Sequence, residues 1–170
     1  MEKSKISFSE RIHFIGIGGI GMSGLAEVMK DMGFNVQGSD IANNKNIERC
    51  RKNGIKIFLK HNKRNIRNSS IIVKSSAIGN NNPEIIFAKS KKLKILKRAE
   101  MLGELIKLKD TSIAISGTHG KTTSCSMLSC ILIEARLNPT VIIGGIVNNF
   151  GSNTLSGNCL LYTSPSPRDS

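Results

Sequence analysis

The residues best suited to carry out chemistry are Gly117–Thr123, which read Gly-Thr-His-Gly-Lys-Thr-Thr. The apolar run before it predicts a strand, and the stretch 124–135 after it predicts a helix. Glycines let backbone N–H groups turn toward an anion, and the N-terminus of a helix adds about half a positive charge. Lys121 would add a full charge for β- and γ-phosphates, and Thr122 a hydroxyl for Mg²⁺. The general phosphate-loop pattern wants a glycine where Ile115 stands, yet strand, turn and helix together favour a nucleotide site over a hydrated glycine turn.

A second glycine turn stands near the N-terminus. Gly16, Gly18 and Gly21 follow a predicted strand over 11–15 and precede an apolar helix side. Asp40 ends the next predicted strand, roughly 20 residues beyond the turn, which is the ribose-binding arrangement of a Rossmann βαβ unit. The sequence therefore predicts a second phosphate-binding turn. Asp40 has an alternative role as a helix N-cap or turn residue.

The elements around these turns alternate between strand and helix. This rhythm predicts an α/β fold, with a parallel sheet covered by helices on both faces. Because ligands sit at the carboxyl ends of such strands, we expect Gly16–Ser23, Ser39-Asp40 and Ser75–Ile78 to line one crevice. His13 lies inside an apolar strand, so we expect a core histidine with satisfied hydrogen bonds rather than a ligand. The remaining expected helices are 47–53, 83–90 and 98–108, and the remaining strands 34–38, 55–58, 70–74, 93–96 and 141–143.

The two turns also suggest a division of the chain. Residues 109–111 are the best boundary between them, and two phosphate turns argue against a simple dehydrogenase, which needs one. We expect residues 1–10 to be loose and residues 11–109 to form a Rossmann-like domain. Residues 110–158 would then begin a second α/β domain carrying the loop at Gly117.

Composition narrows the functional class. The formal charge is +13, but the lysines are dispersed and aromatic residues make up only 4%, which argues against a base-stacking nucleic-acid surface. The four cysteines form no C-x-x-C pair, so free thiols in a reducing compartment are expected. No apolar stretch reaches the roughly 18 residues of a membrane span, and the N-terminus does not resemble a signal peptide. We therefore expect a cytoplasmic protein without nucleic-acid, membrane or protein partners.

Several blocks together carry a family resemblance. In the order and spacing of the Mur ligases, and from about residue 11 to 158, the chain resembles the branch of that family that adds the first amino acid to the peptidoglycan precursor. The blocks are H-F-I-G-I-G-G-I-G-M-S-G-L-A-E at 13–27, G-S-D at 38–40, S-S-A-I at 75–78, N-P-E at 82–84, R-A-E-M-L at 98–102, G-T-H-G-K-T-T at 117–123 and I-I-G-G at 142–145.

The resemblance implies a three-domain ATP-dependent ligase that joins L-alanine to UDP-N-acetylmuramate through an acyl phosphate. It implies ATP and Mg²⁺ as cofactors, with Lys121 and Thr122 as catalytic residues and Thr122 on the metal. The implied ATP-binding residues are Gly117, Thr118, His119, Gly120, Lys121, Thr122 and Thr123. The implied UDP-sugar-binding residues are Gly18, Gly19, Ile20, Gly21, Met22 and Ser23 at the diphosphate, with Asp40, Ser75, Ser76 and Ala77 on the uridine side.

After residue 158 the sequence departs from the family pattern. Mur ligases continue there into a strand and an acidic cluster that supplies a second metal-binding carboxylate, whereas residues 159–170 match nothing in the family. We therefore expect residues 159–170 to lie outside the fold and the central domain to be incomplete. We also expect the chain by itself to form no amide.

Two other function classes stay open at this point. The first is a non-catalytic UDP-sugar-binding module made of the first domain. The second is a nicotinamide-dependent oxidoreductase, which the turn at Gly16–Gly21 and Asp40 would suit. Lys121 and Thr122 argue against the oxidoreductase, since such an enzyme has no use for a phosphate loop of this kind.

Overall fold

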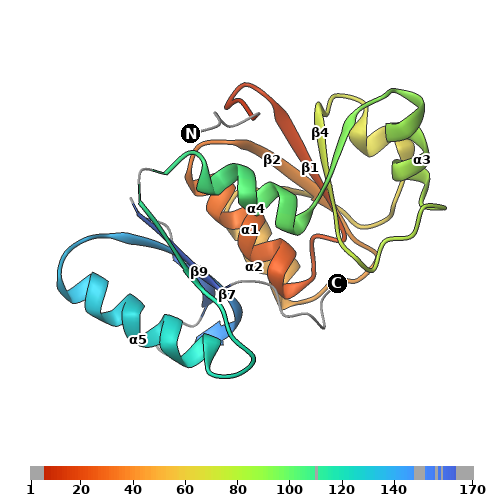
Figure 1. Ribbon diagram of the computed structural model, residues 1–170. Coiled ribbons are helices and arrows are strands. Elements are labelled where there is room, and N and C mark those ends of the chain that lie inside the picture. Colours follow the sequence, from red (N-terminus) through yellow and green to blue (C-terminus); the bar gives the residue numbers. More distant parts are fainter. Residues whose placement is uncertain (1–5, 110, 148–151, 156, 158, 164–170) are drawn as a thin grey trace.

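The computed structural model describes residues 6–109, 111–147, 152–155, 157 and 159–163. They form two sheets with their helices (Figure 1). The first part contains β1 (Arg11–Ile15), α1 (Ile20–Asp31), β2 (Asn35–Ser39), α2 (Lys45–Lys52), β3 (Lys56–Phe58), the 3₁₀ helix η1 (Lys63–Ile66), β4 (Ile71–Lys74), α3 (Pro83–Ser90), β5 (Lys94–Lys97) and α4 (Arg98–Ile106). The second part contains β6 (Ser112–Ile115), α5 (Lys121–Glu134), β7 (Pro139–Val147), β8 (Ser152–Leu155) and β9 (Cys159–Thr163).

The first sheet has the strand order β3-β2-β1-β4-β5, and every neighbouring pair is parallel. Successive residues of β4 face opposite ways, because side chains alternate along a strand. Ile71 and Val73 pack into a core with α1, α2 and α4, whereas Ile72 packs into a smaller core with η1 and α3. Helices thus cover both faces, which confirms the predicted parallel α/β fold.

The strand order reverses between β1 and β4, which lie side by side in the centre of the sheet. The chain leaves β1 toward α1 on one face and, after β4, continues toward α3 on the other. The turns after these two strands therefore meet at one edge, and this is where ligands bind in open α/β sheets. Gly16 and Ser75 are in contact there, since a Cβ on Gly16 would lie 3.0 Å from the Ser75 Cβ.

The second sheet has the order β6-β9-β7-β8, with β6, β9 and β7 parallel and β8 antiparallel to β7. It corrects our expectation that residues 159–170 lie outside the fold. Cys159–Thr163 is β9, paired between β6 and β7, and Leu161 is fully buried in the core under α5. The run Cys-Leu-Leu-Tyr is apolar, and such a run favours a strand even where the sequence matches no block of the family. Residues 164–170 lie outside the described residues.

The N-terminal segment is better packed than expected. We predicted that residues 1–10 would be loose, but Ile6 is buried in the main core and the Phe8 ring stacks on Phe34 with 4.4 Å between ring centroids. The backbone N–H of Ser7 also donates to the Glu10 carboxylate at 2.8 Å. Apolar side chains thus attach this segment to the first sheet. Residues 1–5 lie outside the described residues.

Candidate functional site

The first glycine turn connects β1 to α1. Gly16 adopts a φ of +79°, a conformation that favours glycine, and the N–H groups of Gly16 and Ile17 both donate to the Ser39 carbonyl, at 2.9 and 3.2 Å. Gly19 is the N-cap of α1. The first-turn N–H groups of α1 therefore face the carboxyl edge of the sheet, where they can bind an anion.

Asp40 and two asparagines hold this turn from outside. The Asp40 carboxylate accepts from the backbone N–H of Gly18 at 2.7 Å and from that of Ala42 at 2.9 Å. The Gly18 carbonyl accepts from the side-chain amides of Asn44, at 3.2 Å, and Asn46, at 2.8 Å. Asp40 thus has the turn role that the sequence left open as an alternative. Its contact with a ribose stays a prediction.

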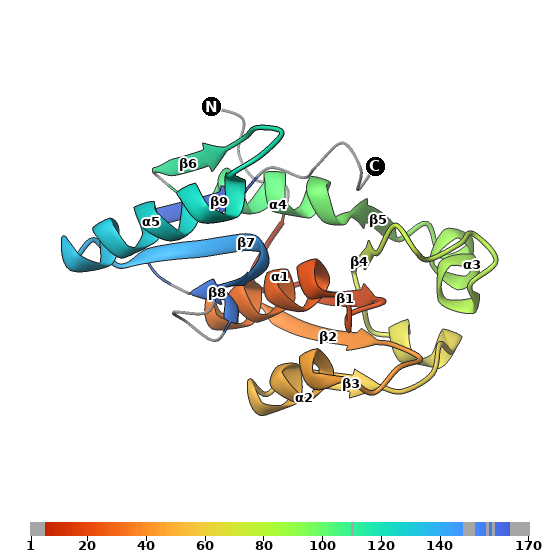
Figure 2. The same ribbon diagram turned by 90° about the horizontal axis from the view of Figure 1, so that it is seen from below.

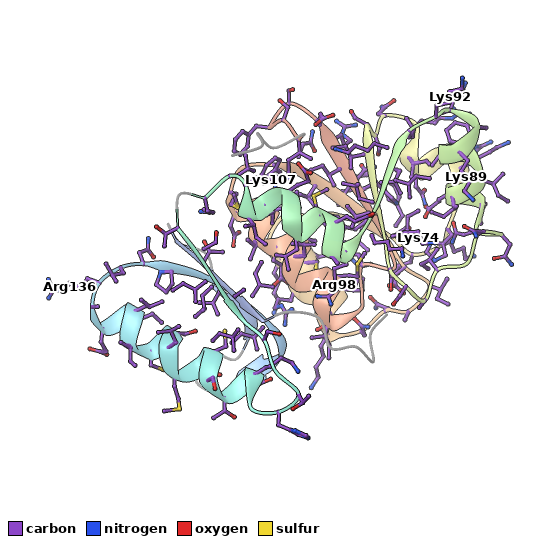
Figure 3. All side chains as sticks on the ribbon, in the orientation of Figure 1. Lys74, Lys89, Lys92, Arg98, Lys107 and Arg136 are labelled. Atoms are coloured by element: carbon purple, nitrogen blue, oxygen red, sulfur yellow. The ribbon has the colours of Figure 1, made fainter. Side chains whose placement is uncertain are left out.

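Arg98 stands against the same turn, and sequence reasoning assigned it no role. It is the first residue of α4, directly after β5, and a Cβ on Gly21 would lie 3.0 Å from its Nη1 atom (Figure 3). A guanidinium beside the positive end of α1 is unfavourable unless an anion lies with them. Arg98 could have been predicted, because it follows a parallel strand at the edge where ligands bind.

The predicted loop after β4 joins this edge. The Ser75 N–H donates to the Ile15 carbonyl at 3.1 Å, and the Ala77 N–H donates to the Ser75 hydroxyl at 3.4 Å. Ser76 and Ala77 are exposed. The structure therefore brings the loop of Ser75–Ala77 to the first glycine turn, as the sequence predicted.

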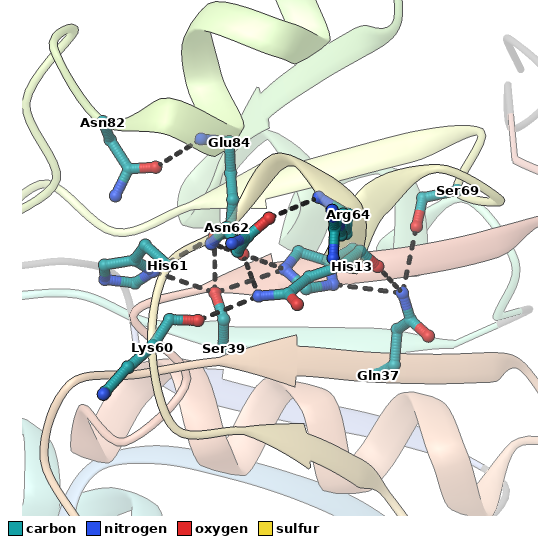
Figure 4. Close-up of polar contacts among 11 residues, drawn as sticks. His13, Gln37, Ser39, Lys60, His61, Asn62, Arg64, Ser69, Asn82 and Glu84 are labelled. Carbon is teal, nitrogen blue, oxygen red and sulfur yellow. Dashed lines mark hydrogen bonds and ion pairs between the residues drawn. The ribbon is translucent and has the colours of Figure 1, made fainter.

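A buried polar cluster lies on the α3 face of the same sheet, around Glu84 (Figure 4). The Glu84 carboxylate accepts from the Ser39 hydroxyl at 2.6 Å and the Asn65 amide at 2.7 Å, and it lies 3.6 Å from Nε2 of His13. Burial by itself would raise the pKa of Glu84, but the hydrogen bonds from His13, Ser39 and Asn65 outweigh it and lower the pKa to about 2. Glu84 is therefore a buried carboxylate that stays ionised.

The same cluster fixes two histidines. His13 is fully buried, and its Nδ1 accepts from Gln37 at 3.2 Å, which confirms the predicted core role. Nδ1 of His61 lies 3.0 Å from the Ser39 hydroxyl oxygen and 3.1 Å from the Glu84 carboxylate. Since both atoms accept, Nδ1 of His61 carries the proton and Nε2 is turned away from the cluster (Figure 4). His61 follows β3 at the carboxyl edge, so it is a further candidate binding residue that the sequence reasoning missed.

The second glycine turn connects β6 to α5 in the other sheet. Gly117 and Gly120 adopt φ values of +155° and +76°, and Gly120 is the N-cap of α5. The Lys121 ammonium folds back over the turn and donates to the Gly117 carbonyl at 2.5 Å. Thr118, His119, Thr122 and Thr123 are exposed. Backbone donors, a helix N-terminus and a lysine thus converge on one exposed place, as a phosphate cradle requires.

The groups at this turn suit phosphate oxygens better than they enclose a metal ion. Thr122 lies in the first turn of α5 and would supply one hydroxyl ligand to Mg²⁺. Within the described part of the chain, no group of three or more His, Cys, Asp or Glu side chains could hold a metal ion. Mg²⁺ usually keeps several waters and is shared with substrate phosphates, so a single hydroxyl is compatible with it.

The described helices also include none that is long and apolar enough to cross a membrane.

Comparison with known proteins gives one consistent result. A model of the Mur ligase family, catalytic domain, matches residues 11–110. The UDP-N-acetylmuramate–L-alanine ligase of Pelagibacter ubique is 56% identical over 146 residues, which are 86% of this chain and 31% of that protein. The ligase of the same name from Rickettsia typhi is 56% identical over 146 residues, 86% of this chain and 29% of that protein.

Solved structures agree with this. The UDP-N-acetylmuramate-alanine ligase of Thermotoga maritima superimposes with a TM-score of 0.83 at 35% identity, covering 91% of this chain and 36% of that one. A ligase for UDP-N-acetylmuramate and the peptide L-alanyl-γ-D-glutamyl-meso-diaminopimelate from Neisseria meningitides gives 0.80 at 27% identity, covering 91% and 52%. The chain spans about 30% of the length of the curated relatives it matches.

Proposed function

The chain belongs to the Mur ligase family, and from this we propose that it carries the sugar-nucleotide and ATP sites of a ligase that joins L-alanine to UDP-N-acetylmuramate. The sequence blocks had already indicated this family, and the homologues support a peptidoglycan ligase. The substrates named in the relatives, UDP-N-acetylmuramate and L-alanine, are the ones we propose here. The two glycine turns support two separate sites, the first for the UDP-sugar and the second for ATP.

The observation that carries the first half of this proposal is the meeting of Arg98 with the N-terminus of α1 at Gly21. Two positive groups at one place are stabilised together by an anion with several acceptor oxygens. A diphosphate supplies these oxygens. The UDP diphosphate would thus lie on the first turn, with Asp40, Ser75–Ala77 and His61 on the uridine side.

The second half rests on the turn at Gly117–Thr123. Backbone N–H groups and Lys121 would neutralise the β- and γ-phosphates of ATP, and Mg²⁺, held by Thr122 and the phosphates, would neutralise charge at the transferred group. In the proposed reaction a carboxylate oxygen of the muramoyl group attacks the γ-phosphorus and ADP leaves. The amine nitrogen of alanine then attacks the acyl carbon, phosphate leaves, and the amine gives up a proton. Positioning and charge neutralisation are what such a transfer chiefly needs.

The test measures binding of UDP-N-acetylmuramate to the 170-residue chain by calorimetry. Arg98→Ala should weaken binding about 10- to 100-fold, the effect of losing a charge-assisted hydrogen bond, and Arg98→Lys should restore part of it. The matched control is Lys107→Ala, because Lys107 is a cation at the opposite end of α4.

Unchanged affinity in Arg98→Ala would contradict the diphosphate assignment. Tighter binding of NADH than of the UDP-sugar would favour the oxidoreductase instead. UDP-sugar binding by a full-length protein that forms no amide from UDP-N-acetylmuramate, L-alanine and ATP would favour the non-catalytic binding module. That the 170 residues alone form no amide stays a prediction, which incubation with all three substrates tests directly.

A further inference from the structure

Helix α1 lies between the two sheets. It contacts β2, α2 and α4 of the first part and also β7 and β8 of the second (Figure 2). Every residue from Met22 to Met29 is buried. A surface helix buries one side only, so burial around more than two turns means that both sides of α1 are covered. The helix that begins at the first glycine turn is therefore also part of the packing of the second sheet.

Two adjacent isoleucines in β7 face opposite sides of the second sheet. Ile142 is 5% exposed and belongs to the core cluster that contains Met22, Leu25 and Met29 of α1. Ile143 is 1% exposed and packs in the cluster of Cys125, together with the half-buried Leu128 and Leu132 of α5. Strand β7 thus separates α1 from α5 and contacts both.

Both helices begin at a glycine turn. Gly19 caps α1 and Gly120 caps α5, so each helix starts where a phosphate is expected to bind. A continuous series of packed elements therefore runs from the first turn through α1, β7 and α5 to the second turn. A ligand that reduces the local opening of α1 also reduces the opening of the strand that α1 covers.

We propose that binding of the UDP-sugar at the first turn stabilises the second sheet and its glycine turn, through α1 and the side chain of Ile142. The inference rests on the proposed function, since it takes the UDP diphosphate to bind at α1. Ile142 acts here as a positioning residue, because it touches neither nucleotide. Linkage makes the effect reciprocal: the factor by which the UDP-sugar tightens ATP binding should equal the factor by which ATP tightens UDP-sugar binding.

The experiment is hydrogen exchange with mass spectrometry on the 170-residue chain, with and without UDP-N-acetylmuramate. We expect slower exchange in residues 16–23, and also about fivefold or more slower exchange in residues 121–134 and 139–143, a coupling of ordinary size. Ile142→Ala should abolish the distant protection and keep that of residues 16–23. Ile143→Ala is the matched comparison, since it removes the same atoms from the α5 side of the same strand; it should keep the protection of residues 139–143, which α1 covers, and weaken only that of residues 121–134.

Ile142→Val and Ile143→Val repeat the comparison with a smaller change, in case either alanine variant fails to fold. A merely structural role of Ile142 would speed exchange equally with and without the UDP-sugar, and that result would overturn the inference. Protection confined to residues 16–23 in the unmodified chain would overturn it while leaving the proposed function standing. If residues 16–23 gain no protection either, the proposed site fails, and the inference fails with it.

Discussion

The two glycine turns follow the same local plan but are held in different ways. The first is fixed from outside by Asp40, Asn44 and Asn46, which come from the next loop and helix. The contacts described for the second are local, with Lys121 on Gly117 and His119 on Thr118. A turn held by distant side chains is set before its ligand arrives, whereas a locally held turn depends on its ligand and on the sheet below it. The first site should therefore be preorganised, and the second should gain its order on binding.

The largest expected effect is at the second turn. In a full-length ligase that carries this segment, Lys121→Ala should lower turnover at least about 100-fold. The substitution removes the positive charge that would neutralise the transferred phosphate. Binding of the UDP-sugar should change far less than turnover. Steady-state amide formation and calorimetry measure the two quantities. The control Lys121→Arg keeps the charge and should recover part of the rate, and near-normal turnover of Lys121→Ala would refute the assignment.

The next effect compares two adjacent glycines of the first turn. A Cβ on Gly18 would lie 2.9 Å from the Asp40 carboxylate and 3.1 Å from the Asn44 amide, so Gly18→Val must displace the groups that hold the turn. UDP-sugar affinity should fall by about 100-fold, while the far-UV circular dichroism spectrum stays that of an α/β protein. The size follows from losing about two hydrogen bonds to charged or oriented groups.

Gly19→Ala is the companion variant. A Cβ on Gly19 would meet only ordinary contacts, 3.7 Å from the Gly16 carbonyl oxygen and 3.9 Å from the Met22 side chain. The free protein should tolerate the change, so an affinity loss of about tenfold would report the close approach of a ligand to the backbone. If both variants bound the UDP-sugar as tightly as the unmodified chain, the turn would not be the diphosphate site.

A third effect is on pH dependence and concerns the first sheet. The pKa of Glu84 is lowered to about 2 in the folded protein from an ordinary value of 4.5. The stabilisation is therefore complete above about pH 4.5 and is lost as the pH falls toward 2, by about 3 kcal/mol. Urea unfolding between pH 7 and 2.5 measures it. In Glu84→Gln the part of the slope due to this residue should disappear, and a slope equal to that of the unmodified chain would contradict the assignment.

The smallest effect concerns thiol reactivity in the two parts of the chain. Burial raises the pKa of Cys50, in α2, to about 12 and that of Cys125, in α5, to about 11, while Cys130 is half-buried. Of these three cysteines, Cys130 is the most accessible and should react first with iodoacetamide at pH 8, since the raised pKa of the other two lowers their share of the reactive thiolate. If the second sheet opens more readily than the first, Cys125 should follow before Cys50. Peptide mass spectrometry over time gives the order of labelling. Labelling of Cys50 before Cys125 would mean that the first sheet opens more readily than the second.

The sequence was most informative where the signals are local. Alternation of apolar runs predicted the first sheet, Pro83 marked the start of α3, and Gly33 ends α1 with a φ of +94°. It was less informative where pairing is distant in sequence. Nothing near Cys159–Thr163 indicates that this segment pairs with β6 and β7, because the partners lie far back along the chain.

The candidate site shows the same limit. Glycine turns are readable because backbone conformation dictates their composition. Arg98 and His61 reach the edge of the sheet through the fold. Arg98 opens the family block R-A-E-M-L at 98–102, but no local pattern assigns a ligand to either residue. For Asp40 the sequence left two roles open, and the contact with Gly18 settles only the structural one.

The position of β9 has a consequence for synthesis on the ribosome. All strands of the first sheet have been made once Lys97 has emerged, so this part can fold while elongation continues. The second sheet must wait, because β9 is inserted between β6 and β7, which are made earlier. At about 5–20 residues per second, the nascent chain spends several seconds with the apolar side chains of β6 and β7 uncovered.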